Sequence, residues 1–180
     1  MKRLGIVGGA LLLWAGAAFA DGFTLKSGVE GQFTKVQEYD GFGCTGENTS
    51  PALRWANAPK GTKSFAVTVY DPDAPTGSGW WHWVAFDIPA KAAGLKEGAG
   101  KGDGSLLPAG AVQSVTSYGA PGFGGACPPV GDKPHRYVIT AYALDVEKLG
   151  IDGKATPALA GYMLNAHALA KASVILYYGR

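Results

Sequence analysis

Two carboxylates and two imidazoles are the side chains in this sequence best placed to do chemistry together. Asp71 and Asp73 belong to the segment Asp71-Pro72-Asp73-Ala74-Pro75, which follows an apolar run, and His82 and His135 stand at the start of two further apolar runs. If the ends of these runs converge in the fold, the four side chains face one small cavity. Proline and glycine in the adjoining loops direct the backbone, which favours a preformed pocket.

Three kinds of site can be built from this set. A metal site of two histidines and one aspartate is weakly supported, because the sequence has no His-x-His or His-x-x-x-His spacing. A serine hydrolase would need an elbow such as Gly-x-Ser-x-Gly, which is absent. In an anion site, imidazoles and backbone N–H groups hold a phosphate-like group, while the carboxylates orient the imidazoles and favour their charged form. We favour the anion site and expect neither a metal nor a cofactor.

Each of these residues also has a purely structural explanation. Asp71 before a proline can simply start a turn, and a histidine at the start of a strand is often a hydrogen-bonded structural residue. His167 lies in a helical pattern, so we assign it no role. The tryptophans of 80–83 can be core packing. The coincidence of four such side chains at strand ends bordered by proline loops is what favours a site.

The rest of the chain predicts the elements that must position these residues. With 28 glycines and 11 prolines in 180 residues, the composition argues against a helix bundle and for a β-rich fold. The main predicted strands are 64–70, 80–88 and 135–144, and shorter ones are 23–25, 34–39, 53–55, 112–116 and 173–178. Apolar residues at helical spacing predict a helix over 156–170. These elements indicate one domain, a β-sandwich or barrel-like sheet with a peripheral helix.

The first 20 residues have the pattern of a signal peptide. Lys2 and Arg3 precede an apolar stretch, and Ala18-Phe19-Ala20 places small residues where a signal peptidase cleaves. A membrane anchor is the alternative, but the stretch is shorter than the roughly 20 residues that a bilayer span needs. We therefore expect cleavage after Ala20 and a periplasmic or secreted domain of residues 21–180 without a transmembrane segment.

Outside that segment the chain is electrically neutral. The whole chain has 16 Lys and Arg against 14 Asp and Glu, and two of the basic residues lie in the first 20, so residues 21–180 carry 14 of each kind. A neutral chain without basic clusters is a poor nucleic-acid binder, so we expect no nucleic-acid partner.

The two cysteines, Cys44 and Cys127, both lie in glycine-rich segments. In an exported protein an even pair usually forms a disulfide. A metal pair would need another Cys or His at close spacing, and neither cysteine has one within four residues. A catalytic thiol is the third alternative, but Cys127 has no local activating motif. We predict a Cys44–Cys127 disulfide.

The motifs around the candidate site resemble those of the phosphatidylethanolamine-binding protein family. The resemblance rests on Asp71-Pro72-Asp73-Ala74-Pro75, on Trp81-His82, and on Pro128-Pro129-Val130-Gly131 ahead of His135-Arg136-Tyr137. The flanking segment 48–55 and the ending 178–180 resemble the bacterial branch of that family, often called Raf-kinase-inhibitor-like proteins. The similarity spans about residues 23–180.

This resemblance implies a mainly β fold: a β-sandwich with Greek-key connections, one or two peripheral helices and a small anion-binding cavity. It implies that the ligand-binding residues are Asp71, Asp73, Trp81, His82, Pro128, His135 and Tyr137. It also implies a cis bond between Ala74 and Pro75. Because the chain stops soon after its last predicted strand, the C-terminal helix of animal members is expected to be missing.

Two functional hypotheses follow. The first is an exported, non-enzymatic protein that binds a phosphate-like or carboxylate head group, such as that of a phospholipid, and acts as an inhibitor or interaction module. The second is a weak hydrolase or isomerase that uses Asp71 and His135 as acid–base partners. The kinase partners of animal members are cytosolic, so the protein partner stays open, as does the choice between monomer and homodimer.

Overall fold

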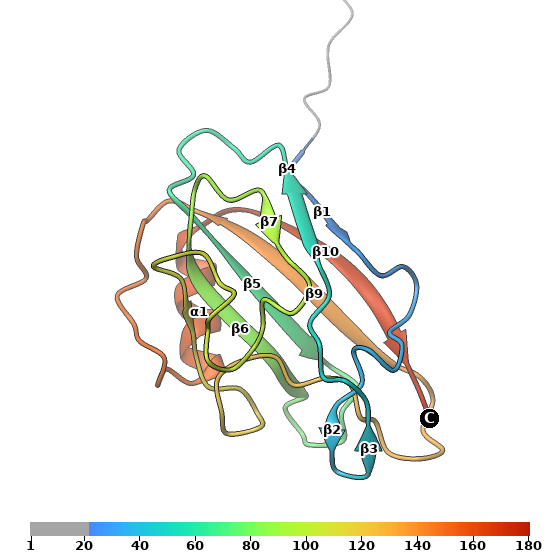
Figure 1. Cartoon of the computed structure of the whole chain (residues 1–180). Coiled ribbons are helices and arrows are strands. Elements are labelled where there is room, and N and C mark those ends of the chain that lie inside the picture. The colour runs from blue at the N-terminus through green and yellow to red at the C-terminus, as the bar shows by residue number, and fades with distance from the viewer. Residues whose placement is uncertain (1–21) are drawn as a thin grey trace, which may run out of the picture.

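The structure is a computed structural model in which residues 22–180 are described (Figure 1). The predicted signal peptide, 1–20, and its cleavage point therefore lie outside the described residues. No helix within 22–180 is long and apolar enough to cross a membrane.

Ten strands and one helix make up the described part of the chain. The strands are β1 (Thr24–Ser27), β2 (Asp40–Gly41), β3 (Cys44–Thr45), β4 (Leu53–Ala56), β5 (Ser64–Asp71), β6 (Trp80–Pro89), β7 (Gly94–Leu95), β8 (Val112–Gln113), β9 (His135–Leu144) and β10 (Ala168–Tyr178), and the helix is α1 (Pro157–His167). Five strands form the larger sheet in the order β10-β9-β5-β6-β8, three form a smaller sheet in the order β1-β4-β7, and β2 pairs with β3. Every strand pairing within these sheets is antiparallel.

The two main sheets pack face to face around one apolar core. Leu53 and Trp55 from β4 meet Val67, Val69 and other buried side chains of the larger sheet. Figure 1 shows β1 and β4 lying across the long strands β5, β9 and β10, with α1 on the opposite side of the larger sheet. The mainly β sandwich with a peripheral helix that the sequence predicts is thus confirmed.

Helix α1 covers the second face of the larger sheet. Its first turn is set by Thr156, whose hydroxyl accepts a hydrogen bond from the backbone N–H of Leu159, and by Pro157 at the first helical position. Ala160 and Leu164 are fully buried against residues of β5, β6 and β9. The sequence predicted a helix to residue 170, but the chain leaves the helix at Ala168, which pairs with Leu144 as the start of β10. Pairing along an 11-residue strand prevails here over local helical spacing.

The predicted strand at 34–39 was wrong. These residues form turns in which the backbone N–H groups of Gln37 and Glu38 donate to the carbonyl of Thr34. The Thr34 hydroxyl also donates to the Gln37 side chain at 3.0 Å. Threonine that bonds to nearby groups in this way favours a turn over an extended strand.

Two further expectations concern covalent geometry. Among residues 22–180 there is no cis peptide bond, so the cis Ala74–Pro75 bond expected from the family resemblance was wrong for this structure. The predicted disulfide is present between Cys44 and Cys127, which lie 83 residues apart in the sequence.

Candidate functional site

The central strand β5 brings the candidate residues together. Its neighbours β6 and β9 both run antiparallel to it, so the C-terminal end of β5 lies beside the N-terminal ends of both. Asp71 is the last residue of β5, His82 is the third residue of β6, and His135 is the first residue of β9. Residues that are far apart in sequence therefore meet at one edge of the sheet because of strand direction alone.

A cavity of about 170 Å³ opens at this edge. Its polar lining comes from Asp71, Thr76, His82, His135 and Tyr137. Aromatic and proline side chains complete it, chiefly Phe42, Pro75, Trp80, Tyr118, Pro128 and Pro129. Five of the seven ligand-binding residues that the resemblance implied thus face one space: Asp71, His82, Pro128, His135 and Tyr137.

Asp71 and His135 form a buried pair within this cavity. The Nδ1 atom of His135 lies 2.8 Å from Oδ2 of Asp71, and both side chains are about 95% buried. A carboxylate only accepts, so the imidazole N–H donates. The other oxygen of Asp71 accepts the backbone N–H groups of Asp73 and Ala74 at 2.8 and 3.1 Å. These bonds fix the carboxylate, which in turn fixes the ring of His135.

His82 is held differently. Its Nδ1 atom lies 2.7 Å from the carbonyl oxygen of Gly124, which can only accept, so Nδ1 carries the proton. Burial lowers the pKa of His82 to about 4, outweighing the opposing effects of the Gly124 carbonyl and of Asp71. The ring is therefore neutral near pH 7, and the expectation of a cationic imidazole was wrong for His82. Desolvation in this position exceeds the attraction of the nearby carboxylate.

Tyr137 forms the floor of the cavity. Its ring is fully buried and packs edge-on against His82, with centroids 5.0 Å apart. Burial raises the pKa of its hydroxyl well above the usual range, so the group is an uncharged donor or acceptor. The Tyr137 oxygen and His82 Nε2 are the two buried side-chain polar atoms of the described residues without a hydrogen-bond partner.

Asp73 does not line the cavity. Both of its oxygens bond to Arg136, at 2.7 Å to Nη2 and 2.9 Å to Nε, on the outer face of the sheet. The Arg136 guanidinium lowers the pKa of Asp73 to about 2. Arg136 lies between His135 and Tyr137 in β9, so its side chain points to the opposite face from theirs.

Trp81 is likewise directed away from the cavity. Its ring packs on Tyr70 at a centroid distance of 4.5 Å and lies against the cluster beneath α1. Trp80, rather than Trp81, lines the cavity. The sequence contained the signal for this, because residues 80 and 82 share one face of a strand and residue 81 has the other.

Sequence reasoning also missed Phe42 and Tyr118, which come from loops. The two rings stack with centroids 5.9 Å apart, and Tyr39 packs on Tyr118 at 4.4 Å. Phe42 is 70% exposed and adopts a positive φ of 53°. Neither residue belongs to a motif or a regular strand, and only the tertiary fold carries them to the mouth of the cavity.

A glycine-rich segment packs against His82 and Tyr118, two of the residues that line the cavity. A Cβ atom on Gly124 would lie 2.3 Å from the ring of Tyr118, and one on Gly125 would lie 2.3 Å from the carbonyl oxygen of Gln37. The absence of side chains lets Gly124 reach His82, and lets the N–H of Gly125 donate to Asn48 at 2.7 Å. These two glycines are required for close approach.

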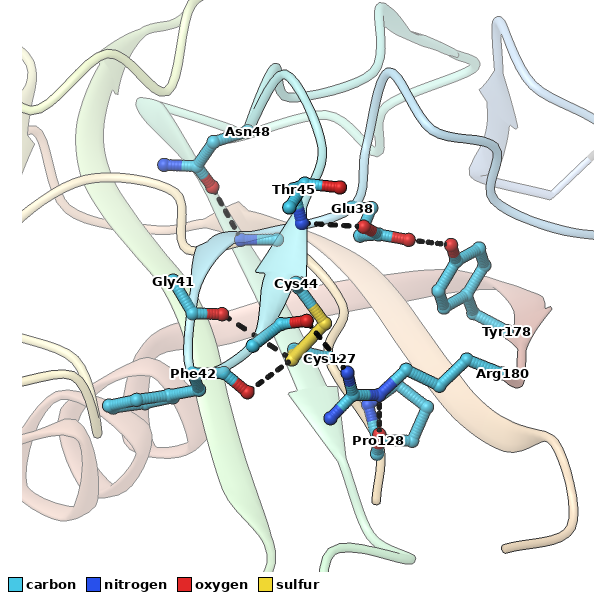
Figure 2. The surroundings of a disulfide bond; sticks show 12 residues. Glu38, Gly41, Phe42, Cys44, Thr45, Asn48, Cys127, Pro128, Tyr178 and Arg180 are labelled. Atoms are coloured by element: carbon cyan, nitrogen blue, oxygen red, sulfur yellow. Dashed lines mark hydrogen bonds between the residues drawn. A yellow bond between two sulfur atoms is a disulfide. The ribbon is translucent and has the colours of Figure 1, made fainter. Parts of the chain in front are cut away.

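The disulfide fixes one rim of the cavity (Figure 2). It joins Cys44, in the hairpin that carries Phe42, to Cys127, which lines the cavity next to Pro128. Arg180 supports the same junction, because its guanidinium donates to the carbonyls of Pro128 at 2.6 Å and Gly43 at 3.1 Å. Figure 2 shows the Arg180 side chain beside the disulfide, between the two segments that it bridges.

No cluster of three or more His, Cys, Asp or Glu side chains within residues 22–180 has the geometry to hold a metal ion. The cavity offers a fixed carboxylate–imidazole pair, a neutral imidazole and a tyrosine hydroxyl, under a rim of aromatic and proline side chains.

Comparison with known proteins gives consistent matches. The family model described as phosphatidylethanolamine-binding protein matches residues 19–179. UPF0098 protein YbcL of Escherichia coli is 56% identical over 147 residues, covering 82% of this chain and 80% of that protein. UPF0098 protein YbhB of the same organism is 48% identical over 136 residues, covering 76% and 85%.

Solved structures agree with these sequence matches. The crystal structure of E. coli YbcL, described as a new member of the mammalian PEBP family, superposes with a TM-score of 0.86 at 52% identity, covering 89% of this chain and 99% of that one. A PEBP homologue from Chlamydia trachomatis gives a TM-score of 0.68 at 27% identity, covering 88% and 98%.

Proposed function

Because this chain belongs to the phosphatidylethanolamine-binding protein family, we propose that it is an exported binding protein whose cavity holds the phosphate-like or carboxylate head group of a small ligand. The observation that carries this proposal is the buried, preorganised polar lining of a cavity of about 170 Å³. A cavity of this size admits a head group and leaves the remainder of a larger ligand at the aromatic mouth.

The main physical support for ligand binding is that the polar side chains of the cavity are already held in place. His135 is locked by Asp71, His82 is locked by the Gly124 carbonyl, and Asp71 is itself held by two backbone N–H groups. Side chains that are already ordered lose little conformational entropy when a ligand binds, so even a small head group can bind measurably. With few polar contacts, the affinity for free phosphate should lie near millimolar, about −4 kcal/mol.

Export is proposed on separate grounds. The first 20 residues combine two basic residues, an apolar stretch and a cleavage-type triplet. The Cys44–Cys127 disulfide is compatible with an oxidising compartment such as the periplasm. Sequencing the N-terminus of the mature protein should give Asp-Gly-Phe-Thr, and an intact Met1 would refute cleavage after Ala20.

Binding is favoured over catalysis by the state of the possible nucleophiles. The Thr76 hydroxyl, which lines the cavity, donates to the carbonyl of Gly79 at 2.5 Å. The raised pKa of the Tyr137 hydroxyl makes its phenolate form inaccessible near neutral pH. The Asp71–His135 pair could move a proton or activate a water molecule, so a weak hydrolase or isomerase is the second candidate function.

The test is a titration with inorganic phosphate at pH 6, followed by NMR of the three histidine rings. The rings of His82 and His135 should shift with a common, roughly millimolar dissociation constant. His167, which bonds to Asp145 at 2.9 Å away from the cavity, is the internal control. If only His167 responds, or if none of the three rings responds, the cavity is not an anion site.

A further inference from the structure

Two unpartnered atoms in the cavity specify what a ligand must offer. His82 Nε2 and the Tyr137 hydroxyl are buried, and no group among the described residues bonds to either. More than nine in ten buried polar groups in proteins have a hydrogen-bond partner, so two exceptions in one cavity need an explanation. Both residues line the space assigned above to the ligand.

The role of His82 Nε2 follows from its other ring nitrogen. Nδ1 holds the proton that is donated to the Gly124 carbonyl at 2.7 Å. A neutral imidazole with its proton on Nδ1 has only a lone pair on Nε2, which makes this atom an acceptor. Burial keeps the ring in this neutral form, since it lowers the pKa of His82 to about 4.

The surroundings of His82 also limit the charge of a ligand. Asp71 faces it from β5, His135 and Tyr137 face it from β9, and Tyr118 packs on it from a loop. Two further carboxylates lie near this cluster: Asp132 is 3.4 Å from Nε2 of His135, and Asp73, which is paired with Arg136, acts on Tyr137 through its charge. A ligand atom beside His82 therefore meets a lone pair and a nearby carboxylate, both of which repel a bare anionic oxygen.

This inference rests on the proposed anion pocket and narrows its ligand class. We propose that the cavity selects anions that carry a proton to donate, so that a singly protonated phosphate monoester fits while a sulfate ester or a phosphodiester of the same charge does not. The P–OH group donates to His82 Nε2, and a second phosphoryl oxygen accepts from the Tyr137 hydroxyl. Sulfate esters and phosphodiesters have acceptors only, so they leave the His82 lone pair facing an oxygen.

Methyl phosphate and methyl sulfate form a matched pair of probes for this proposal. At pH 5 both are singly charged, because the second pKa of a phosphate monoester lies near about 6. They have nearly the same shape and differ in one donatable proton. Leaving a buried acceptor unpaired should make methyl sulfate bind at least about tenfold more weakly than methyl phosphate. Dimethyl phosphate should be as weak as methyl sulfate, which also separates a phosphodiester head group from a monoester.

Raising the pH gives a second readout. Above about pH 6 methyl phosphate loses its remaining proton, so its advantage over methyl sulfate should shrink about tenfold per pH unit. The ratio of the two affinities is the quantity to follow, because ionisation of groups in the protein affects both probes. A ratio that stays constant or rises between pH 5 and 8 would overturn the proposal.

Two variants connect the selectivity to one side chain. In His82→Gln an amide can donate as well as accept, so the preference for methyl phosphate should fall to nearly one. His167→Gln is the matched control outside the cavity and should keep the wild-type preference. Should His82→Gln fail to fold, ¹⁵N NMR of the wild-type ring decides the same point: Nε2 must be unprotonated at pH 7, and a protonated Nε2 refutes the proposal.

The outcomes separate this inference from the proposed function. Tighter binding of methyl phosphate supports both. Equal binding of the two probes, or tighter binding of methyl sulfate, overturns the proton-donor requirement but leaves an anion pocket. If neither probe shifts the rings of His82 and His135, the anion pocket and the inference fail together.

Discussion

Removing the Cys44–Cys127 bridge should destabilise the protein mainly by freeing its unfolded state. The cysteines lie 83 residues apart, and the chain-entropy relation for a loop of that length gives about 4.5 kcal/mol at 25 °C. Measured effects of native disulfides are usually smaller, about 2–4 kcal/mol, so we expect a loss within that range for the double variant Cys44→Ala, Cys127→Ala.

The fold of the variant should nevertheless persist. Arg180 still bonds to the carbonyls of Pro128 and Gly43 on both sides of the former bridge. Glu38 still binds the Thr45 N–H at 2.9 Å and the Tyr178 hydroxyl (Figure 2). These contacts hold the hairpin and the cavity rim in the folded state. Most of the loss in unfolding free energy therefore comes from the greater conformational freedom of the unfolded state.

Urea unfolding at 25 °C, followed by tryptophan fluorescence and circular dichroism, measures this loss. The slope of unfolding free energy against urea should increase, because an unfolded chain without the cross-link exposes more surface. Wild-type protein reduced with a phosphine should match the double variant, which controls for the alanine side chains. A loss below about 1 kcal/mol, with an unchanged slope, would refute the loop-entropy reasoning.

Three further predictions test other parts of the structure. Glu38→Gln should lower the free energy of unfolding by on the order of 2 kcal/mol at pH 7, whereas the exposed control Glu30→Gln should leave it nearly unchanged. Although burial opposes the shift, hydrogen bonding chiefly to Lys35 lowers the pKa of Glu38 from 4.5 to about 2. The extra stability of the wild type over Glu38→Gln should therefore persist above about pH 4.5 and disappear as the pH falls towards 2, and urea unfolding across this pH range can contradict that trend. Tyr137→Phe removes an unpartnered hydroxyl, so thermal stability should be unchanged or raised while phosphate binding weakens; a clear drop in melting temperature would mean that the hydroxyl is bonded within the fold. Leu164→Ala, on the fully buried face of α1, should lower the free energy of unfolding by about 2–5 kcal/mol, whereas Leu159→Ala on the exposed side of the helix should lower it by less than about 1 kcal/mol. Equal losses would show that α1 is not docked as described.

Much of the framework was readable from local sequence. The runs that became β5, β6 and β9 are rich in β-branched and aromatic residues. Asp71 ends the first, Pro89 ends the second and His135 begins the third, so their positions are fixed within a residue or two. The two cysteines and the export pattern predicted the disulfide without any knowledge of distance. Helix α1 was visible from its apolar residues at helical spacing and from Pro157, although its end was not.

The sequence motifs located the site correctly but did not show which of their side chains line the cavity. Strand alternation assigns Trp80 and His82 to one face and Trp81 to the other, yet motif resemblance had put Trp81 in the cavity. Asp73 belongs to the same motif as Asp71, but its turn directs it to Arg136 outside. A motif records which residues occur together, whereas the direction of each side chain depends on strand pairing and turn geometry.

The charge state of the site was decided only by tertiary structure. Sequence placed carboxylates near imidazoles and so favoured cationic rings. Folding instead buries His82 beneath Tyr118 and against Tyr137, and aims Nδ1 at the carbonyl of Gly124, a residue 42 positions away. Burial and hydrogen-bond direction are properties of the packed chain, and here desolvation outweighs the attraction of the carboxylate. The sequence by itself determined which strands end with chemically active residues; packing decided which of them are charged, which are paired and which are left free to bind a ligand.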